Sequence, residues 1–137
     1  MQMLFSAHSG LRYLVLLGGV AAFLYFAYAV ATKKGDERTA GILGSAFVGL
    51  LDLQALLGIV MVVMGTFYPA LIGHLVMMIG AAVIAHVAMA MGRKAADPAK
   101  ANRLRLIGVV VALLLIVGGI SAIGRGVFGS SGGPTVM

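Results

Sequence analysis

The sequence of 137 residues contains no cysteine and no tryptophan, and only 10% of its residues are charged. Without cysteine, disulfides, thiolate metal sites, iron–sulfur clusters and thiol nucleophiles are excluded. Soluble domains are about 45–50% apolar, whereas this chain is 61% apolar. A chain of this length keeps a large surface for its volume and cannot bury that excess in an aqueous core. The composition therefore predicts a protein whose main solvent is lipid.

Acidic residues are scarce, with four against ten basic residues. Eight of the ten basic residues fall in two short stretches: Lys33, Lys34 and Arg38, then Arg93, Lys94, Lys100, Arg103 and Arg105. This distribution is typical of the cytoplasmic loops of membrane proteins. It is not the clustered basic face of a nucleic-acid-binding domain, so we expect no nucleic-acid partner.

Four long apolar runs organise the chain, and they predict helices over about residues 9–31, 41–64, 71–92 and 105–124. Each run is long enough to cross a hydrocarbon core of about 30 Å. The period-two alternation of a membrane β-barrel is absent from the sequence. We therefore predict an all-α membrane protein, a single up-down bundle of four transmembrane helices over residues 1–137.

The connections predict an orientation for this bundle. Residues 32–40 and 92–105 are polar and basic, whereas residues 65–70 are short and uncharged. Basic loops on the cytoplasmic side place both termini and residues 65–70 on the periplasmic or exterior side. We expect a multi-pass protein of a bacterial inner membrane, in contact with the lipid bilayer, and a flexible Gly/Ser-rich tail over residues 126–137.

Glycine and alanine are dense within the apolar runs. Small residues let transmembrane helices approach closely, which is the simplest interpretation of their abundance. Clearance for a flat cofactor is the alternative, and the spacing does not separate the two.

Polar side chains within membrane helices are costly and are candidates for function by default. Six occur here: His8, Arg12, Asp52, Gln54, His74 and His86.

His8 and His74 are the first candidate pair. The first and third predicted helices run parallel from the same membrane face, which places both imidazoles at similar depth. Two such histidines can be the axial ligands of haem b. Arg12 lies four residues after His8 on the same helix face, where it could pair with a haem propionate. The alternative is that both histidines are interfacial residues bonded to water or headgroups.

His86 lies twelve residues after His74, about 18 Å deeper, so these two histidines cannot share a metal. Asp52 is predicted at a depth close to that of His86, with Gln54 nearby in sequence. These three residues are candidates for a proton relay or for holding a quinone head group. A structural ion pair is the alternative. No nucleophilic constellation of a hydrolase is present, so we assign no catalytic residues and expect no catalytic domain.

Three segments resemble a known group of proteins. His8-Ser9-Gly10-Leu11-Arg12, Asp52 to Gly58 and Gly73 to Met78 are similar to segments of short bacterial four-helix membrane proteins often labelled cytochrome B. The likeness covers about two-thirds of the chain and extends into the basic stretch after the third helix. It implies a haem b-type membrane protein that uses His8 and His74.

The sequence thus leaves two main hypotheses. The first is a small haem b-type electron-transfer protein, a subunit of a larger respiratory or photosynthetic membrane complex. The second is a cofactor-free accessory subunit that packs on other subunits through its Gly/Ala faces. A quinone or proton-relay element at Asp52 and His86 is a third, and a homo-oligomer is compatible with each.

Overall fold

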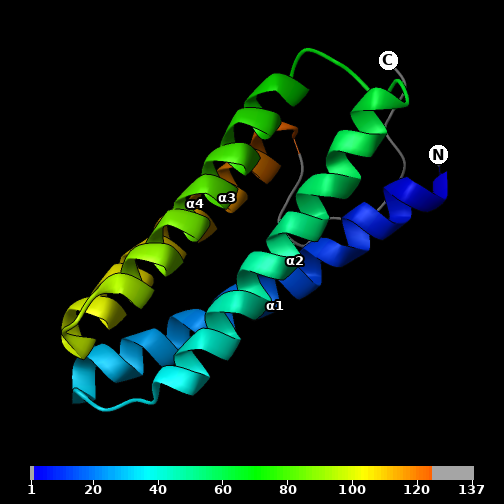
Figure 1. Cartoon of the computed structure of the whole chain (residues 1–137). Helices are drawn as coiled ribbons and strands as arrows, with labels where there is room; N and C mark the ends of the chain where they lie inside the picture. The colour runs from blue at the N-terminus through cyan, green and yellow to red at the C-terminus, as the bar shows by residue number, and fades with distance from the viewer. Residues whose placement is uncertain (1, 125–137) are drawn as a thin grey trace.

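The computed structural model describes residues 2–124 as four helices joined by three connections. These are α1 (Gln2–Thr32), α2 (Glu37–Val63), α3 (Leu71–Lys94) and α4 (Pro98–Ala122), which run antiparallel in chain order (Figure 1). All four are long and apolar enough to cross a membrane, which confirms the prediction of an all-helical chain with four such helices. The predicted tail over residues 126–137 lies outside the described residues.

Three helices begin earlier than the predicted spans, α2 by four residues and α1 and α4 by seven each. α1 begins at Gln2 rather than near residue 9, so His8 lies inside this helix and not before it. α4 begins at Pro98 rather than near residue 105. Asp97 caps α4 by accepting a hydrogen bond from the Ala99 N–H at 3.1 Å, and proline suits a first turn because its missing N–H has no helical partner there. The apolar runs indicate only the part of each helix that crosses hydrocarbon, and polar residues continue the helix beyond it.

Small residues bring the helices together at several points. A Cβ on Gly108 of α4 would lie 2.1 Å from the Ala88 Cβ of α3, and one on Gly19 of α1 would lie 2.9 Å from the Phe47 ring of α2. Large side chains cannot occupy such contacts. At these positions the interpretation of glycine as a packing residue is confirmed. The core they enclose includes Val15, Ala22, Phe26, Phe47, Leu51, Ala81, Ala85, Val109 and Ala112.

The four helices do not pack evenly. α3 packs most closely on α4, and α1 on α2 and α4, whereas α2 and α3 share much less contact. In Figure 1, α2 and α3 diverge toward the connection of residues 64–70 that joins them. We call that end of the bundle the histidine end, and the end that carries the connections 33–36 and 95–97 the basic end.

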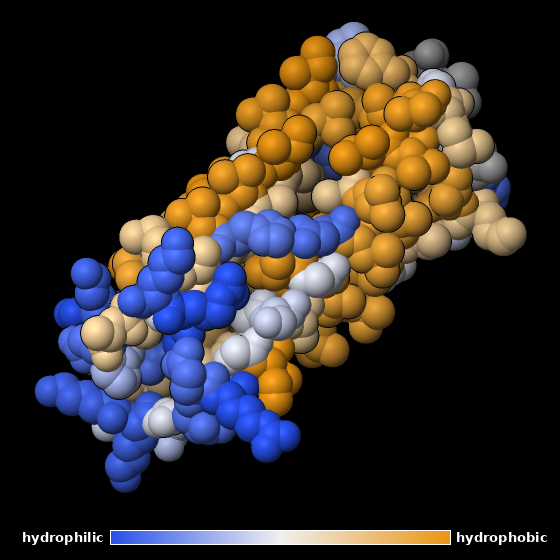
Figure 2. All heavy atoms as spheres, viewed as in Figure 1, coloured by the Kyte–Doolittle hydropathy of each residue, from blue (hydrophilic) through white to orange (hydrophobic). Residues whose placement is uncertain are grey.

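The outside of the bundle is apolar over most of its length, and hydrophilic residues gather at the basic end (Figure 2). Leu17, Val76 and Leu114 are each more than 60% exposed. Exposed apolar side chains on all four helices are what lipid contact requires and what water disfavours. The surface thus agrees with four helices that span a membrane.

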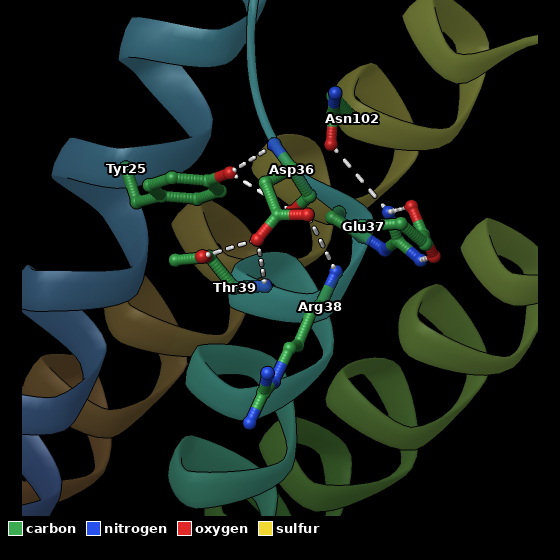
Figure 3. Close-up of polar contacts among 7 residues, drawn as sticks. Tyr25, Asp36, Glu37, Arg38, Thr39 and Asn102 are labelled. Carbon is green, nitrogen blue, oxygen red and sulfur yellow. Dashed lines mark hydrogen bonds and ion pairs between the residues drawn. The ribbon is translucent and has the colours of Figure 1, made fainter.

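Two polar contacts tie the basic end together (Figure 3). The Tyr25 hydroxyl accepts from the Asp36 N–H at 2.7 Å and donates to the Asp36 carbonyl at 3.0 Å. Arg105 is buried and donates from Nη1 to Glu37 Oε2 at 2.9 Å. The sequence placed Arg105 in a polar loop, and this was wrong. α4 starts before it, so the helix carries its side chain inward.

Candidate functional site

His8 of α1 and His74 of α3 lie together at the histidine end. Their ring centroids are 6.4 Å apart, and the ring planes make an angle of 76°. Both residues are half-buried. The prediction that these two imidazoles share one level of the bundle is confirmed. The close approach comes from two helices that begin at the same end.

The ring of His74 is held by α4. Its Nδ1 lies 3.0 Å from the carbonyl oxygen of Gly119. A carbonyl can only accept, so Nδ1 carries a proton, and in the neutral ring the lone pair is then on Nε2. Histidines that bind metals commonly donate their other N–H to a backbone carbonyl in this way, because the bond fixes both tautomer and ring orientation. The bond to Gly119 therefore fixes the orientation of the His74 ring.

α2 contributes two residues beside His8. Gln54, which is 8% exposed, donates from Nε2 to the backbone carbonyl of His8 at 2.8 Å. One turn further along, a Cβ on Gly58 would lie 3.2 Å from Cε1 of the His8 ring. The ring of His8 thus occupies space that exists because residue 58 has no side chain. The site is built by all four helices.

The sequence analysis grouped Gln54 with Asp52 and His86, but the structure places Gln54 beside His8 instead. Gln54 contacts His8, whereas Asp52 points to another partner on α3. Residues two apart in a helix project from different sides, so the spacing itself held a signal against grouping them. The Oε1 atom of Gln54 is buried and finds no hydrogen-bond partner within residues 2–124.

Arg12 lies one turn after His8 on α1 and is 6% exposed. Its Nη2 donates to the Tyr13 hydroxyl at 2.9 Å, and its guanidinium carbon lies 4.8 Å from the centre of the Tyr13 ring. A guanidinium so placed gains cation–π attraction in addition to the hydrogen bond. The structure therefore places a buried positive charge one turn from a histidine of the site. Tyr13 is a neighbour of this charge that the sequence did not single out.

The histidine end is also where the bundle opens. Figure 2 shows a notch between α2 and α3 on this half of the molecule, with apolar atoms around it and a small hydrophilic part visible within it. The divergence of these two helices in Figure 1 agrees with their limited contact.

Asp52 of α2 and His86 of α3 form a second polar centre. Nε2 of His86 lies 2.8 Å from Oδ1 and 2.9 Å from Oδ2 of Asp52. The proximity predicted from their depths is confirmed. Their side chains are 48% and 53% exposed, so the pair lies on the outside of the bundle and not in its core. It is remote from His74, twelve residues earlier on α3.

Metal ligands other than the two histidines are sparse around the site. Within residues 2–124, no group of three or more His, Cys, Asp or Glu side chains is placed to hold a metal ion. Two histidines suit a centre in which a macrocycle supplies the remaining ligands. Comparison with protein-family models, curated proteins and solved structures finds no match.

Two residues of the site escaped the sequence analysis, Gly58 and Gly119. Each of them contacts one of the two histidines. Gly58 leaves room for the His8 ring, and the Gly119 carbonyl accepts a hydrogen bond from His74. Any residue has a carbonyl, and twenty glycines occur in the chain. Neither role has a signature in a single sequence.

Proposed function

We propose that this chain is a small membrane electron-transfer protein that holds haem b between His8 and His74. The observation that carries the proposal is the separation of the two rings. An imidazole nitrogen bonds a transition metal at about 2 Å, and the ring centre lies about 1 Å behind that nitrogen. Two imidazoles on opposite sides of one ion then have centroids about 6 Å apart. The observed centroids are 6.4 Å apart.

The surroundings of the rings support the same function. The Gly119 carbonyl keeps the His74 proton on Nδ1, so Nε2 can donate its lone pair to iron. Gly58 leaves the His8 ring free of a clash with α2. Arg12 brings a buried positive charge one turn from His8, and we assign it to a haem propionate. When bound, haem b would supply a one-electron centre, and its histidine ligands and burial would set its potential.

We further propose that the protein lies in a bacterial inner membrane with its basic end in the cytoplasm. Lys33, Lys34, Arg93 and Lys94 are at or next to the two connections of this end. The positive-inside rule favours this orientation, which directs the histidine end outward. Because residues 2–124 are helices and short connections, electrons would enter and leave through partner subunits of a membrane complex or a carrier within the bilayer.

A pyridine haemochrome assay on the purified chain tests the proposal. We expect the absorption of b haem in the wild-type protein and its loss in both His8→Ala and His74→Ala. His86→Ala is the matched control, because it removes an imidazole from the same helix as His74 but at the other centre. The control variant should keep its haem.

A colourless wild-type protein, expressed with ample haem and folded by circular dichroism, would overturn the proposal. If that colourless protein also co-purified with larger membrane proteins, the accessory-subunit hypothesis would replace it. Equal loss of haem in His74→Ala and His86→Ala would show that the assay reports folding rather than ligation.

A further inference from the structure

The haem proposal does not explain why the Asp52–His86 pair is exposed on the outside of the bundle. Both side chains are about half exposed on helices that span a membrane. Ionisable groups at such depth normally face the interior of a bundle or a polar cavity. Within residues 2–124, the Nδ1 atom of His86 makes no hydrogen bond. Something from outside the bundle is expected to cover this pair.

A cavity of about 270 Å³ lies beside the pair, between α2 and α3. We call it the lateral cavity, and its lining includes Gly44, Ser45, Gly49, His86, Met89 and Arg93. Figure 2 shows hydrophilic residues that continue from the basic end along this seam to the middle of the apolar surface. The cavity therefore connects the level of the polar headgroups with a polar pair within the membrane.

The size and shape of the lateral cavity limit the occupant. Pockets that hold whole small-molecule ligands measure about 300–1,000 Å³, so a cavity of about 270 Å³ suits a head group whose tail remains in lipid. A Cβ on Gly49 would have no atom within 4 Å, so this residue leaves open space beside the α2 wall. A flat ring can lie against such a wall.

The charges of the lateral cavity favour a neutral ring over the phosphate of a phospholipid. Arg93 follows His86 by seven residues, so it lies about 10 Å nearer the membrane surface. A phospholipid phosphate would remain at the level of Arg93, and the Asp52 carboxylate would repel it from deeper positions. A neutral ring with hydroxyl or carbonyl oxygens can reach the pair. Its hydroxyl can donate to Asp52, and its carbonyl can accept from the Ser45 hydroxyl.

From these observations we propose that the lateral cavity binds the head group of a lipid-soluble quinone or quinol, with the Asp52–His86 pair as its polar anchor. The proposal concerns binding alone and holds whether or not His8 and His74 bind haem. Together with the proposed function, it identifies the class of carrier that would exchange electrons with this protein inside the bilayer.

Photoaffinity labelling tests this site directly. The wild-type protein in phosphatidylcholine nanodiscs is irradiated with a decyl-tailed azidoquinone, and labelled peptides are located by mass spectrometry. We expect labels within residues 44–52 or 86–93, suppressed by an excess of decylubiquinone. Gly49→Leu fills the cavity and should reduce labelling about tenfold. Gly41→Leu is the matched control, because Gly41 is also exposed on α2 and lies outside the lining.

A second variant keeps the test decisive if Gly49→Leu fails to fold. Asp52→Asn preserves the side-chain volume but removes the charge, and it should also reduce labelling about tenfold. Labelling that decylubiquinone does not suppress, or that falls equally in Gly49→Leu and Gly41→Leu, overturns the proposal. Displacement of the label by phosphatidylglycerol would assign the cavity to a phospholipid instead. Crosslinking of two chains through this face would assign it to a second copy.

The haem assay and the labelling experiment test the two proposals separately. His8→Ala should lose haem and still label at residues 44–52 or 86–93. Asp52→Asn should keep haem and lose the label.

Discussion

The guanidinium of Arg105, on α4, is paired with the carboxylate of Glu37, the first residue of α2. The two side chains differ sharply in exposure, at 2% for Arg105 and 68% for Glu37. Arg105 also lies over Gly92 of α3, where an added Cβ would be 2.7 Å from the Arg105 Nε. One buried cation thus connects three helices at the basic end.

This asymmetry predicts different costs for removing the two partners. Glu37→Gln leaves a buried guanidinium without its counter-charge, and we expect it to lower the free energy of unfolding by about 1–3 kcal/mol. Arg105→Met leaves Glu37 in contact with water and should cost less, because a buried ion pair is often replaceable by an apolar side chain. Reversible denaturation by sodium dodecyl sulfate, followed by circular dichroism, measures both. Arg103→Gln, an exposed charge on the same helix, should have no measurable effect. Equal costs for Glu37→Gln and Arg105→Met would contradict the argument.

Gly58 offers a test of the haem site that leaves both histidines in place. A side chain at this position meets the His8 ring, with the first carbon already 3.2 Å from Cε1. Gly58→Val should therefore displace the ring and weaken haem binding about tenfold, as changes beside a metal ligand commonly do. Haem content per chain and the spectrum of the reduced protein are the measurements. Gly41→Val is the control, because a Cβ at Gly41 has no atom within 4 Å. Full haem content in Gly58→Val would show that His8 is not held against α2 in the haem-bound protein.

The absence of cysteine makes the orientation testable with single introduced thiols. Ala70→Cys, next to the start of α3 at the histidine end, should react with a membrane-impermeant maleimide in intact spheroplasts. Ala96→Cys, in the connection before α4, should react only after the membrane is disrupted. Both positions are exposed alanines outside the helices, so the two variants differ only in the end of the bundle that they report. The reverse pattern would place the basic end outside the cell.

The turn between α1 and α2 should open in acid. The Thr39 hydroxyl and the backbone N–H groups of Thr39 and Arg38 donate to the Asp36 carboxylate and lower its pKa below the usual value of about 3.9. A carboxyl with a lowered folded-state pKa contributes stability that is fully present above the unfolded-state pKa and is lost as the pH falls through the folded value.

We therefore expect the protection of the Thr39 amide against hydrogen exchange, measured by NMR relative to the intrinsic rate at each pH, to fall when the pH drops below about 4. In Asp36→Ala, the Thr39 amide should lack this protection at every pH. Asp97→Ala removes the corresponding cap of α4 and should leave Thr39 unaffected. A fall in this protection near neutral pH would indicate another titrating group.

Hydropathy along the sequence was sufficient for the membrane architecture. Four runs of about twenty apolar residues can adopt only a few structures in lipid, because each segment must form its backbone hydrogen bonds within itself. The alternation of antiparallel helices then places residues near the starts of the first and third helices at one level. This reasoning predicted that His8 and His74 lie at similar depth, and that Asp52 and His86 do also.

The choice of partners at each level was left to the tertiary structure. Gln54 bonds to His8, 46 residues away, and not to the Asp52–His86 pair. Arg105 pairs with Glu37 across 68 residues. These contacts depend on how each helix is rotated about its axis and where neighbouring helices cross, which small residues such as Gly108 and Gly19 govern through close approach. Hydropathy is a property of each segment alone, whereas rotation and crossing come from the packing of all four helices together.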